Sequence, residues 1–256
     1  MNLKSRLKAQ RPCVGSWITL GHSSVAEIMT HAGFDFLVVD MEHSVIELSE
    51  AQDLIRAVSA GGVVPLVRVG ENNANLIKRV MDAGAQGVIV PLVNTPEDAR
   101  AAVFAAKYPP FGRRGVGLAR AQGYGFSFER YMKKEDPQTV VLALIEHREA
   151  IENLEEILSV QGLDGTLIGP YDLSASLGYP GQFEKPIVRK AVERYEKVCR
   201  RMDRPMGFHM VWPDLRRITD CRRRGYTFLA VGTDSILLGL KCAEILQTVS
   251  KIRKRS

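Results

Sequence analysis

The chain has 256 residues, of which 45% are hydrophobic and 25% charged, with a formal net charge of +6. This composition suits a globular protein of one large barrel or two ordinary domains, and no apolar run approaches the length of a membrane span. The N-terminal segment MNLKSRLKAQRP is charged throughout and lacks the apolar core of a signal peptide, so we expect a soluble, cytoplasmic protein.

The cysteines and the basic runs favour ordinary structural roles. The four cysteines are scattered and form no C-x-x-C pair, which argues against a zinc cluster or a disulfide framework. The basic runs at 200–201, at 222–224 and in the tail KIRKRS fall at predicted helix C-termini, where cations complement the helix dipole. We therefore expect no nucleic-acid partner, and the excess positive charge would attract small anionic substrates.

Short apolar runs alternate with segments of helical periodicity along the chain. The apolar runs lie near 14–20, 36–40, 64–68, 87–91, 140–146, 165–169, 206–210 and 228–232. The segments with helical spacing cover 24–32, 48–60, 74–84, 96–107, 149–160, 187–203, 214–224 and 235–253. Eight strands that alternate with eight helices predict an α/β protein with a parallel sheet, closed into a single (β/α)8 TIM barrel over residues 1–256.

One long stretch interrupts this alternation. From about 108 to 138 the sequence contains Gly, Pro, Arg and aromatic residues without a lasting period. Loops of this length inside a compact domain are usually functional or disordered. We predict a functional loop above or beside the barrel, because Arg113, Arg114 and Arg120 alternate with glycines that let a backbone approach an anion.

Five of the apolar runs end in a polar side chain of a kind used for chemistry. These side chains are His43, Arg68, Glu146, Asp172 and Asp234. In a barrel of parallel strands, catalytic groups sit at the carboxyl ends of the strands. Glu146 and Asp172 end adjacent predicted strands, so their charges repel unless a cation such as Mg2+ or Mn2+ lies between them. The alternative is two separate structural carboxylates, with Asp172 as a helix cap.

His43 and Arg68 each have a catalytic and a structural interpretation. His43 lies beside Asp40 and Glu42, which could fix the tautomer of its ring for proton transfer, although a lone histidine often serves only in packing. Arg68 ends an otherwise apolar strand and needs an anionic partner. A substrate carboxylate would satisfy it, and so would a salt bridge to Glu42 or Glu146.

Several segments resemble the HpcH/HpaI family of class II, metal-dependent pyruvate aldolases, which act on substrates such as 4-hydroxy-2-oxoheptanedioate and 2-dehydro-3-deoxyglucarate. They are GFDFLVVDMEHS, VPLVRV, NLIKRVMDAGAQGVIVPLV, YPPFGRRGVG and GLDGTLIGPYDLSASLG, in order from about Val14 to Asp234. The resemblance implies a phosphoenolpyruvate/pyruvate-type barrel whose C-terminal helix packs on a neighbouring subunit of a homo-oligomer, usually a hexamer.

The resemblance also implies an activity. It is the reversible cleavage of a 4-hydroxy-2-oxo acid to pyruvate and an aldehyde through a metal-bound pyruvate enolate. The cofactor would be Mg2+ or Mn2+, with Co2+ as a further candidate. No lysine ends a predicted strand, which argues against a Schiff-base aldolase.

Carried over residue by residue, the resemblance assigns a role to each matching position. It makes Glu146 and Asp172 the metal ligands, Arg68 the partner of the pyruvate carboxylate and oxo group, and His43 the group that transfers a proton. Asp82 matches the acid that orients the histidine, Trp17 matches an aromatic that lines the site, and Gly169 matches the turn that receives the pyruvate carboxylate.

Three departures from the family pattern affect the acceptor side of the site. Leu144 stands where relatives often have a glutamine, Tyr171 stands where a small residue is common, and the loop continues as LARAQGYGFSF. We therefore expect an acceptor less polar than a sugar-acid semialdehyde, with any acidic end met by arginines of the 112–120 loop. Two other functions stay open: a decarboxylase or condensing enzyme that uses the same enolate, and a non-enzymatic scaffold or RNA-binding barrel.

Overall fold

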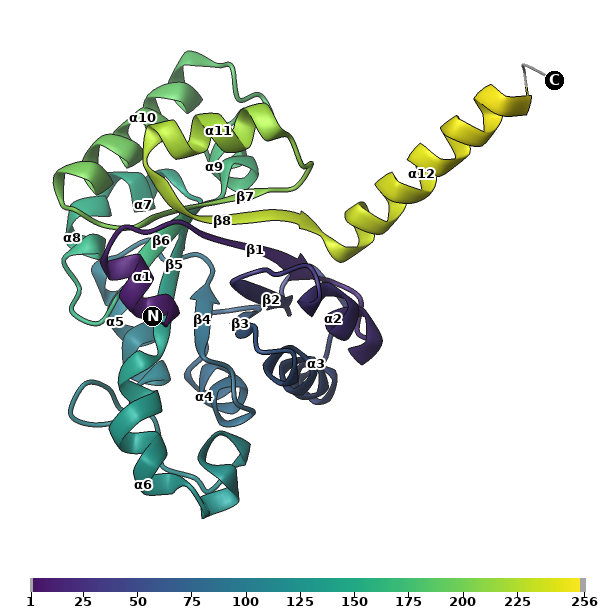
Figure 1. The fold of residues 1–256 in the computed structure, drawn as a ribbon. Helices are drawn as coiled ribbons and strands as arrows, with labels where there is room; N and C mark the ends of the chain where they lie inside the picture. The colour runs from purple at the N-terminus through teal and green to yellow at the C-terminus, as the bar shows by residue number, and fades with distance from the viewer. Residues whose placement is uncertain (1, 254–256) are drawn as a thin grey trace.

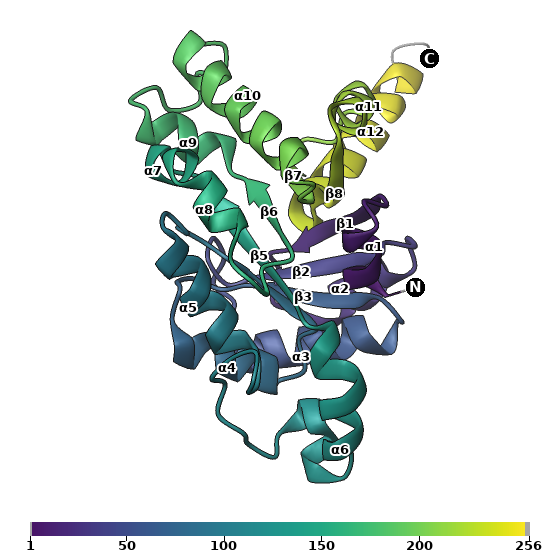
Figure 2. The ribbon, with the colours of Figure 1, turned by 90° about the vertical axis from the view of Figure 1, so that its left-hand side faces the viewer.

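Eight parallel strands close into a barrel in a computed structural model that describes residues 2–253 (Figures 1 and 2). Each strand pairs with its neighbours in chain order, and β1 pairs with both β2 and β8. The predicted (β/α)8 barrel is therefore confirmed. The strands are β1 (Cys13–Ile18), β2 (Phe36–Asp40), β3 (Val64–Arg68), β4 (Gly87–Val90), β5 (Val140–Ile145), β6 (Gly165–Ile168), β7 (Met206–Met210) and β8 (Tyr226–Thr233).

Helices surround the barrel and return the chain from the end of one strand to the start of the next. The helices up to the fifth strand are α1 (Leu3–Lys8), α2 (Ser23–Thr30), α3 (Leu48–Ala60), α4 (Ala74–Asp82), α5 (Pro96–Ala106) and α6 (Phe128–Arg130). Those that follow are α7 (Arg148–Glu152), α8 (Leu154–Leu158), α9 (Pro170–Ser176), α10 (Pro186–Arg201), α11 (Leu215–Arg224) and α12 (Asp234–Arg253). The predicted helix over 149–160 is divided into α7 and α8 at Asn153, whose side chain donates to the Asn94 carbonyl 2.9 Å away.

Helix α1, which the sequence pattern did not predict, closes the floor of the barrel. Leu3 and Leu7 lie one helical turn apart and pack into the inner apolar cluster with Cys13 and Phe36. Lys4 fixes the helix at this end through an ion pair of 2.9 Å to Asp164. The floor is therefore filled by side chains, which leaves the opposite rim as the open end.

The barrel interior is so closely packed near its floor that Gly15 leaves no room for a side chain. Phe36 and Phe228 stack with their ring centroids 4.0 Å apart, and a Cβ at Gly15 would collide with the carbonyl oxygen and ring of Phe36. We expect Gly15→Ala to lower the free energy of unfolding by at least ~1–3 kcal/mol, the usual cost of overpacking a core. Urea denaturation tests this, with Gly115→Ala as the control because its surroundings are open. Equal stability of the two variants would contradict it.

The long segment over 108–138 lies beside the barrel at its floor, so of the two predicted positions, above or beside the barrel, the one above is wrong. The segment joins the end of α5 to the start of β5, and such connections lie at the amino-terminal ends of the strands (Figures 1 and 2). Arg114 is buried, pairs with Asp82 at 2.6 Å, and lies over the rings of Tyr108 and Tyr131. The arginines of this loop therefore do not meet a substrate at the rim of their own chain.

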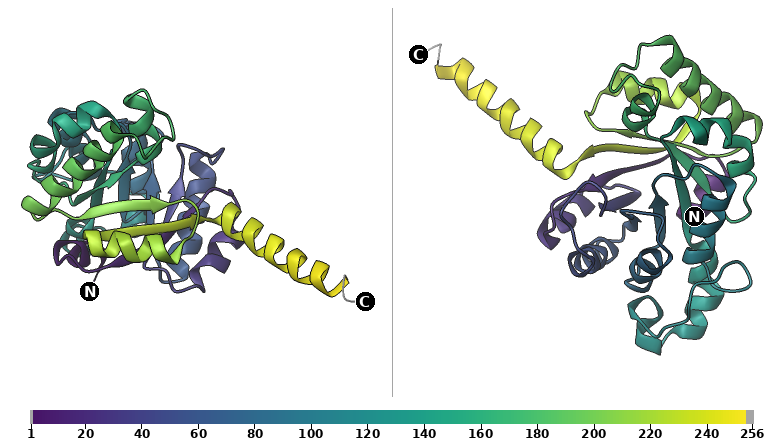
Figure 3. Two further views of the ribbon diagram at one scale, coloured as in Figure 1. Left: turned by 90° about the horizontal axis from the view of Figure 1, so that it is seen from above. Right: turned by 180° about the vertical axis from the view of Figure 1, so that it is seen from behind.

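Helix α12 extends away from the barrel instead of packing on it (Figures 1 and 3). Three of its exposed apolar side chains, Leu238, Ile245 and Val249, share one face of the helix because their spacing is helical. Across residues 2–253, no helix combines the length and apolar character needed to span a bilayer.

Candidate active site

A cavity of about 480 Å3 opens at the carboxyl ends of the strands. It is lined by four of the five strand-end side chains that we predicted for the catalytic rim, namely His43, Arg68, Glu146 and Asp172. The predicted substrate-contacting residues Trp17, Leu144, Gly169 and Tyr171 line the same cavity. Eight of the predicted site residues therefore come together in one chain, from five different strands or the loops that follow them.

Arg68 is held rigidly by two carboxylates. Its Nε and Nη2 atoms donate to the two carboxylate oxygens of Asp40 at 2.9 and 2.6 Å, and its Nη1 atom lies 3.0 Å from Glu42. Burial raises the pKa of Asp40, but the hydrogen bonds and charge of Arg68 outweigh this effect and bring the pKa below its ordinary value. A guanidinium has five N–H groups, so these contacts leave two of them for a ligand. The predicted salt bridge to Glu42 is present, whereas Asp40 is a partner that the sequence did not identify.

Trp17 lies against the face of the Arg68 guanidinium, and His209 packs on Trp17. The Arg68 guanidinium carbon lies 4.4 Å from the centroid of the Trp17 ring, and the His209 ring lies 4.8 Å from that of Trp17. Burial lowers the pKa of His209 to about 4, so its imidazole is neutral at pH 7. The Trp17 Nε1 atom is buried and has no hydrogen-bond partner among the described residues. His209 was missed in the sequence, where its only signal is a polar side chain at an inward position of the run MGFHM.

Glu146 is buried at the end of β5, and its environment disfavours an isolated charge. Burial raises its pKa to about 7, the Leu92 amide opposes this rise, and the charges of Glu42 and Asp172 add to it. The Leu92 N–H donates to Oε1 of Glu146 at 2.7 Å, and Leu92 has a φ of 51°, a backbone conformation that is costly for a non-glycine residue. Gly169 lies directly beside this carboxylate, because a Cβ there would be 2.9 Å from the Glu146 Cβ and 3.2 Å from Oε2.

The carboxylates of Glu146 and Asp172 fit a divalent cation with few protein ligands. Asp172 lies in the first turn of α9 and lines the same cavity as Glu146. A cation between the two would relieve their repulsion and bring the pKa of Glu146 back down. Among the described residues, no group of three or more His, Cys, Asp or Glu side chains is arranged to hold a metal. Water and substrate oxygens would therefore complete the coordination, as is usual for Mg2+.

The structure brings His43 to the cavity but does not bring Asp82 to His43. The His43 ring is largely exposed, with 64% of its side-chain surface accessible, and its Nε2 atom lies 4.0 Å from Glu42. Asp40 positions this loop by accepting the backbone N–H groups of Glu42 and His43. Asp82 ends α4 at the floor, where it pairs with Arg114. The assignment of Asp82 as the acid that orients His43 therefore does not hold within one chain.

Asp234, the remaining acid at a strand end, has a structural role. Its carboxylate accepts hydrogen bonds from the backbone N–H groups of Thr19 and Leu20 and from the Thr19 hydroxyl, at 2.6–3.0 Å. These bonds join the end of β8 to the end of β1, where the barrel closes.

A parallel barrel with charged groups gathered in a cavity at the carboxyl ends of its strands has the arrangement typical of a barrel enzyme. A model of the HpcH/HpaI aldolase/citrate lyase family matches residues 14–239. The chain therefore belongs to the HpcH/HpaI aldolase/citrate lyase family, as the sequence motifs predicted, and it is a carbon–carbon lyase.

Individual relatives agree with this assignment. The chain is 39% identical over 236 residues to a 2-keto-3-deoxy-L-rhamnonate aldolase of Escherichia coli O17:K52:H18, with 91% of this chain and 87% of that protein covered. It is similar to the crystal structure of a family protein from Burkholderia cenocepacia J2315, at 32% identity and a TM-score of 0.91, covering 97% of this chain and 98% of that one. It is also similar to the citrate synthase SbnG, at 27% identity and a TM-score of 0.86, covering 99% of both chains.

Proposed function

We propose that this enzyme reversibly cleaves a 4-hydroxy-2-oxo acid into pyruvate and an aldehyde, with a divalent metal held by Glu146 and Asp172. One observation carries the proposal: an anion-binding guanidinium and two carboxylates suited to a cation line one cavity at the rim. A 2-oxo acid needs the guanidinium because its carboxylate is an anion. It needs the cation because its oxo group must accept negative charge during the reaction. When bound, the metal supplies the Lewis acidity that polarises this oxo group.

Arg68 and Gly169 would bind the pyruvate portion of the substrate. Two N–H groups of Arg68 are left by its contacts with Asp40 and Glu42, and they can donate to the carboxylate and the oxo oxygen. Because Asp40 and Trp17 fix the guanidinium before substrate binds, little reorganisation is needed as negative charge develops. Gly169 and the backbone that follows it would receive the carboxylate, since the absence of a side chain at Gly169 keeps the space beside Glu146 open.

His43 is the proposed base. In the cleavage direction it would remove the proton of the 4-hydroxyl group, after which the C3–C4 bond breaks, the aldehyde departs and the electron pair is delocalised into the enolate of pyruvate. In the synthetic direction the same imidazole would return the proton to the alkoxide. Glu42, 4.0 Å from the ring, is the carboxylate of this chain best placed to stabilise the protonated form.

Leu144 and Tyr171 would make the acceptor side of the cavity less polar than in relatives with a glutamine and a small residue at these positions. Leu144 is buried beside Gly169, and Tyr171 lines the cavity with about half of its surface exposed. A substrate hydroxyl placed against Leu144 would lose a hydrogen bond worth about 1–3 kcal/mol.

The direct test is incubation of the purified protein with pyruvate, a panel of aldehydes and Mg2+, Mn2+ or Co2+, followed by mass analysis of the products. We expect an adduct whose mass is the sum of pyruvate and one aldehyde, formed only with metal. The likeness to a citrate synthase favours a second candidate, condensation of the same enolate onto a 2-oxo acid acceptor. Product formed with oxaloacetate but with no aldehyde would select this second activity.

We also propose that α12 docks on a second copy of the chain, as expected for a homo-oligomer. The helix leaves its own barrel and exposes Leu238, Ile245 and Leu246, which an isolated subunit would leave in water. We expect Leu246→Lys to shift the mass measured by light scattering from an oligomer towards the monomer, because a buried lysine without a partner is costly. An unchanged mass would show that this side chain is not in the interface. Lys241→Arg, on the same helix, is the control.

Arg68→Lys should impair substrate binding without unpairing Asp40. Lysine keeps the positive charge but lacks the planar fork that binds a carboxylate with two parallel hydrogen bonds. The loss of one charge-assisted bond is worth about 1.5–3 kcal/mol, so we expect kcat/KM to fall by roughly 10- to 100-fold. Steady-state kinetics test this, with Arg56→Lys in an exposed pair on α3 as the control. A normal kcat/KM for Arg68→Lys would exclude Arg68 from substrate binding.

A further inference from the structure

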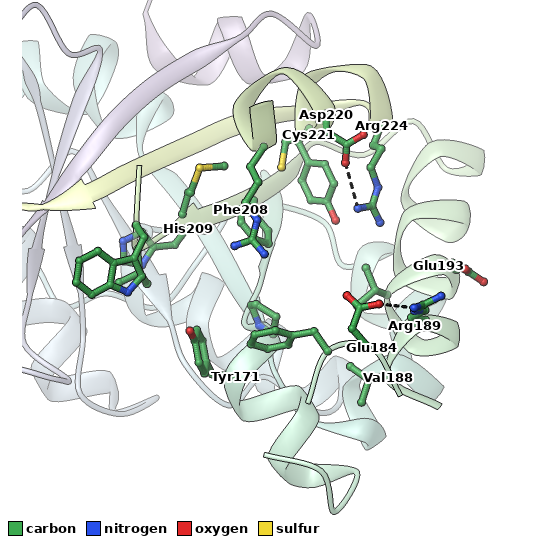
Figure 4. A pocket seen from close by; sticks show the side chains of 18 residues that line it. Tyr171, Glu184, Val188, Arg189, Glu193, Phe208, His209, Asp220, Cys221 and Arg224 are labelled. Atoms are coloured by element: carbon green, nitrogen blue, oxygen red, sulfur yellow. Dashed lines mark hydrogen bonds and ion pairs between the residues drawn. The ribbon is translucent and has the colours of Figure 1, made fainter. Parts of the chain in front are cut away.

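A second cavity of about 370 Å3 lies between α10 and α11, on the outer side of β7 (Figure 4). We call it the α10–α11 groove. Apolar side chains form part of its lining, with Val188 and Val192 from α10, Phe208 from β7, and Phe183 from the segment before α10. Figure 4 shows Phe208 between the two helices and Tyr171 and His209 at one end of the groove.

The groove adjoins the catalytic cavity. Pro170, Tyr171, His209 and Val211 line both spaces. Tyr171 packs edge-on against Phe183 with ring centroids 4.9 Å apart, so the side chain that departs from the family pattern lies at the boundary between the two spaces. A molecule bound at Glu146 and Arg68 that extends past Tyr171 would reach this second space.

Six charged side chains line the groove, and four of them form ion pairs with one another, while Glu193 and Arg217 do not belong to these pairs. Glu184 pairs with Arg189, and Asp220 pairs with Arg224, as the dashed lines in Figure 4 mark. Paired charges offer little to a charged ligand, because a new ion would have to displace an existing partner. The apolar part of the lining, with Phe183, Val192 and Phe208, therefore suits an uncharged, apolar group.

We propose that the α10–α11 groove is the subsite for the body of the acceptor aldehyde, and that this body is an unbranched alkyl chain or an aromatic ring. This inference rests on the proposed aldolase function and adds to it the place where the acceptor binds. The aldehyde carbon would lie beside the enolate in the catalytic cavity, and the apolar body would pass Tyr171 and pack against Phe183, Val192 and Phe208. A groove of this volume is too small for a helix but accommodates a chain of several methylenes.

The test compares hexanal with acetaldehyde as acceptors, in wild type and in Val192→Trp, which fills the groove. Each buried methylene contributes about fourfold to binding, so the ratio of kcat/KM for hexanal to that for acetaldehyde should fall at least about tenfold in Val192→Trp. Ile187→Trp, on an exposed face of α10 outside the groove, should keep the wild-type ratio. Phe183→Ala, which removes one wall, should lower the ratio in the same direction and covers the case in which Val192→Trp does not fold.

A measurement that needs no aldehyde separates this inference from the proposed function. Deuterium exchange at C3 of pyruvate, followed by NMR in D2O with Mg2+ or Mn2+, reports formation of the enolate alone. We expect exchange in wild type and in Val192→Trp. Normal exchange with an unchanged acceptor ratio in both groove variants would overturn the groove inference only. No exchange in wild type with any metal would overturn the proposed function and the acceptor subsite with it. An unchanged ratio accompanied by a change of oligomeric mass in Val192→Trp would assign the groove to a second copy of the chain.

Discussion

Replacing Glu146 by Gln is expected to abolish turnover and weaken divalent-metal binding while the fold is retained. The amide keeps the size of the side chain and can still accept the Leu92 N–H, but it loses the charge that holds a cation. Asp172→Asn should act in the same way. Because the metal stabilises developing negative charge by several kcal/mol, the expected loss in kcat is ~10³-fold or more.

Isothermal titration with Mn2+ and steady-state kinetics measure the two effects separately. Glu149→Gln is a suitable control, since Glu149 is a half-exposed carboxylate in α7, the helix that follows Glu146. Circular dichroism should show the same fold in all three variants. Full activity of the wild type in excess chelator would contradict a metal at this site.

The raised pKa of Glu146 gives a second, activity-independent measurement on the metal-free protein. Its pKa of about 7 lies above the ordinary value of 4.5, so the folded state holds a proton that the unfolded state releases between these values. Stability should therefore fall as the pH rises from about 5 to 8, by up to about 3 kcal/mol. Glu146→Gln should remove this dependence and be more stable than wild type at pH 8, but not at pH 4.5. Metal binding should strengthen over the same interval, because the ligand must lose its proton.

Replacing His43 by Ala is expected to lower the rate of aldol cleavage by ~10²- to 10⁴-fold, the usual contribution of a positioned proton-transfer group. Metal affinity should be nearly unchanged, because the imidazole is not among the proposed ligands. The stability of the protein should also change little, since the ring is mostly exposed and makes no hydrogen bond within the described residues. The measurements are kcat at saturating substrate and the Kd for Mn2+.

His31→Ala is the matched control, since His31 is an exposed histidine at the end of α2. It should keep wild-type kinetics. A normal rate for His43→Ala, or a loss that added metal restores completely, would return His43 to a structural role.

The strands and the rim were predictable from the sequence for a local reason. A parallel strand that is buried on both faces is a continuous apolar run, and the runs at 36–40, 64–68 and 206–210 match the observed strands residue for residue. Since the carboxyl ends of all the strands meet at one rim, residues that end these runs could be expected to meet as well. This reasoning correctly brought Glu146 and Asp172 into one cavity.

The position of the long loop shows where this reasoning failed, and Asp82 shows where the resemblance does not hold within one chain. The loop over 108–138 precedes a strand, so its position at the floor follows from the same topology, but its glycines and arginines suggested a catalytic position. Asp82 was placed beside His43 by resemblance alone, whereas the direction of α4 takes it to the opposite end of the barrel.

The sequence by itself determined the number and order of the strands, the parallel barrel, the family, and that His43, Arg68, Glu146 and Asp172 lie at the rim. The tertiary structure alone decided that Asp40 holds Arg68, that the Leu92 amide bonds to Glu146, and that a second cavity shares Tyr171 with the catalytic cavity. The difference has a physical cause. Strand and helix periodicities come from interactions between residues close in the chain, whereas these contacts join residues that are 28 to 54 positions apart or lie on different helices, and no local pattern encodes them.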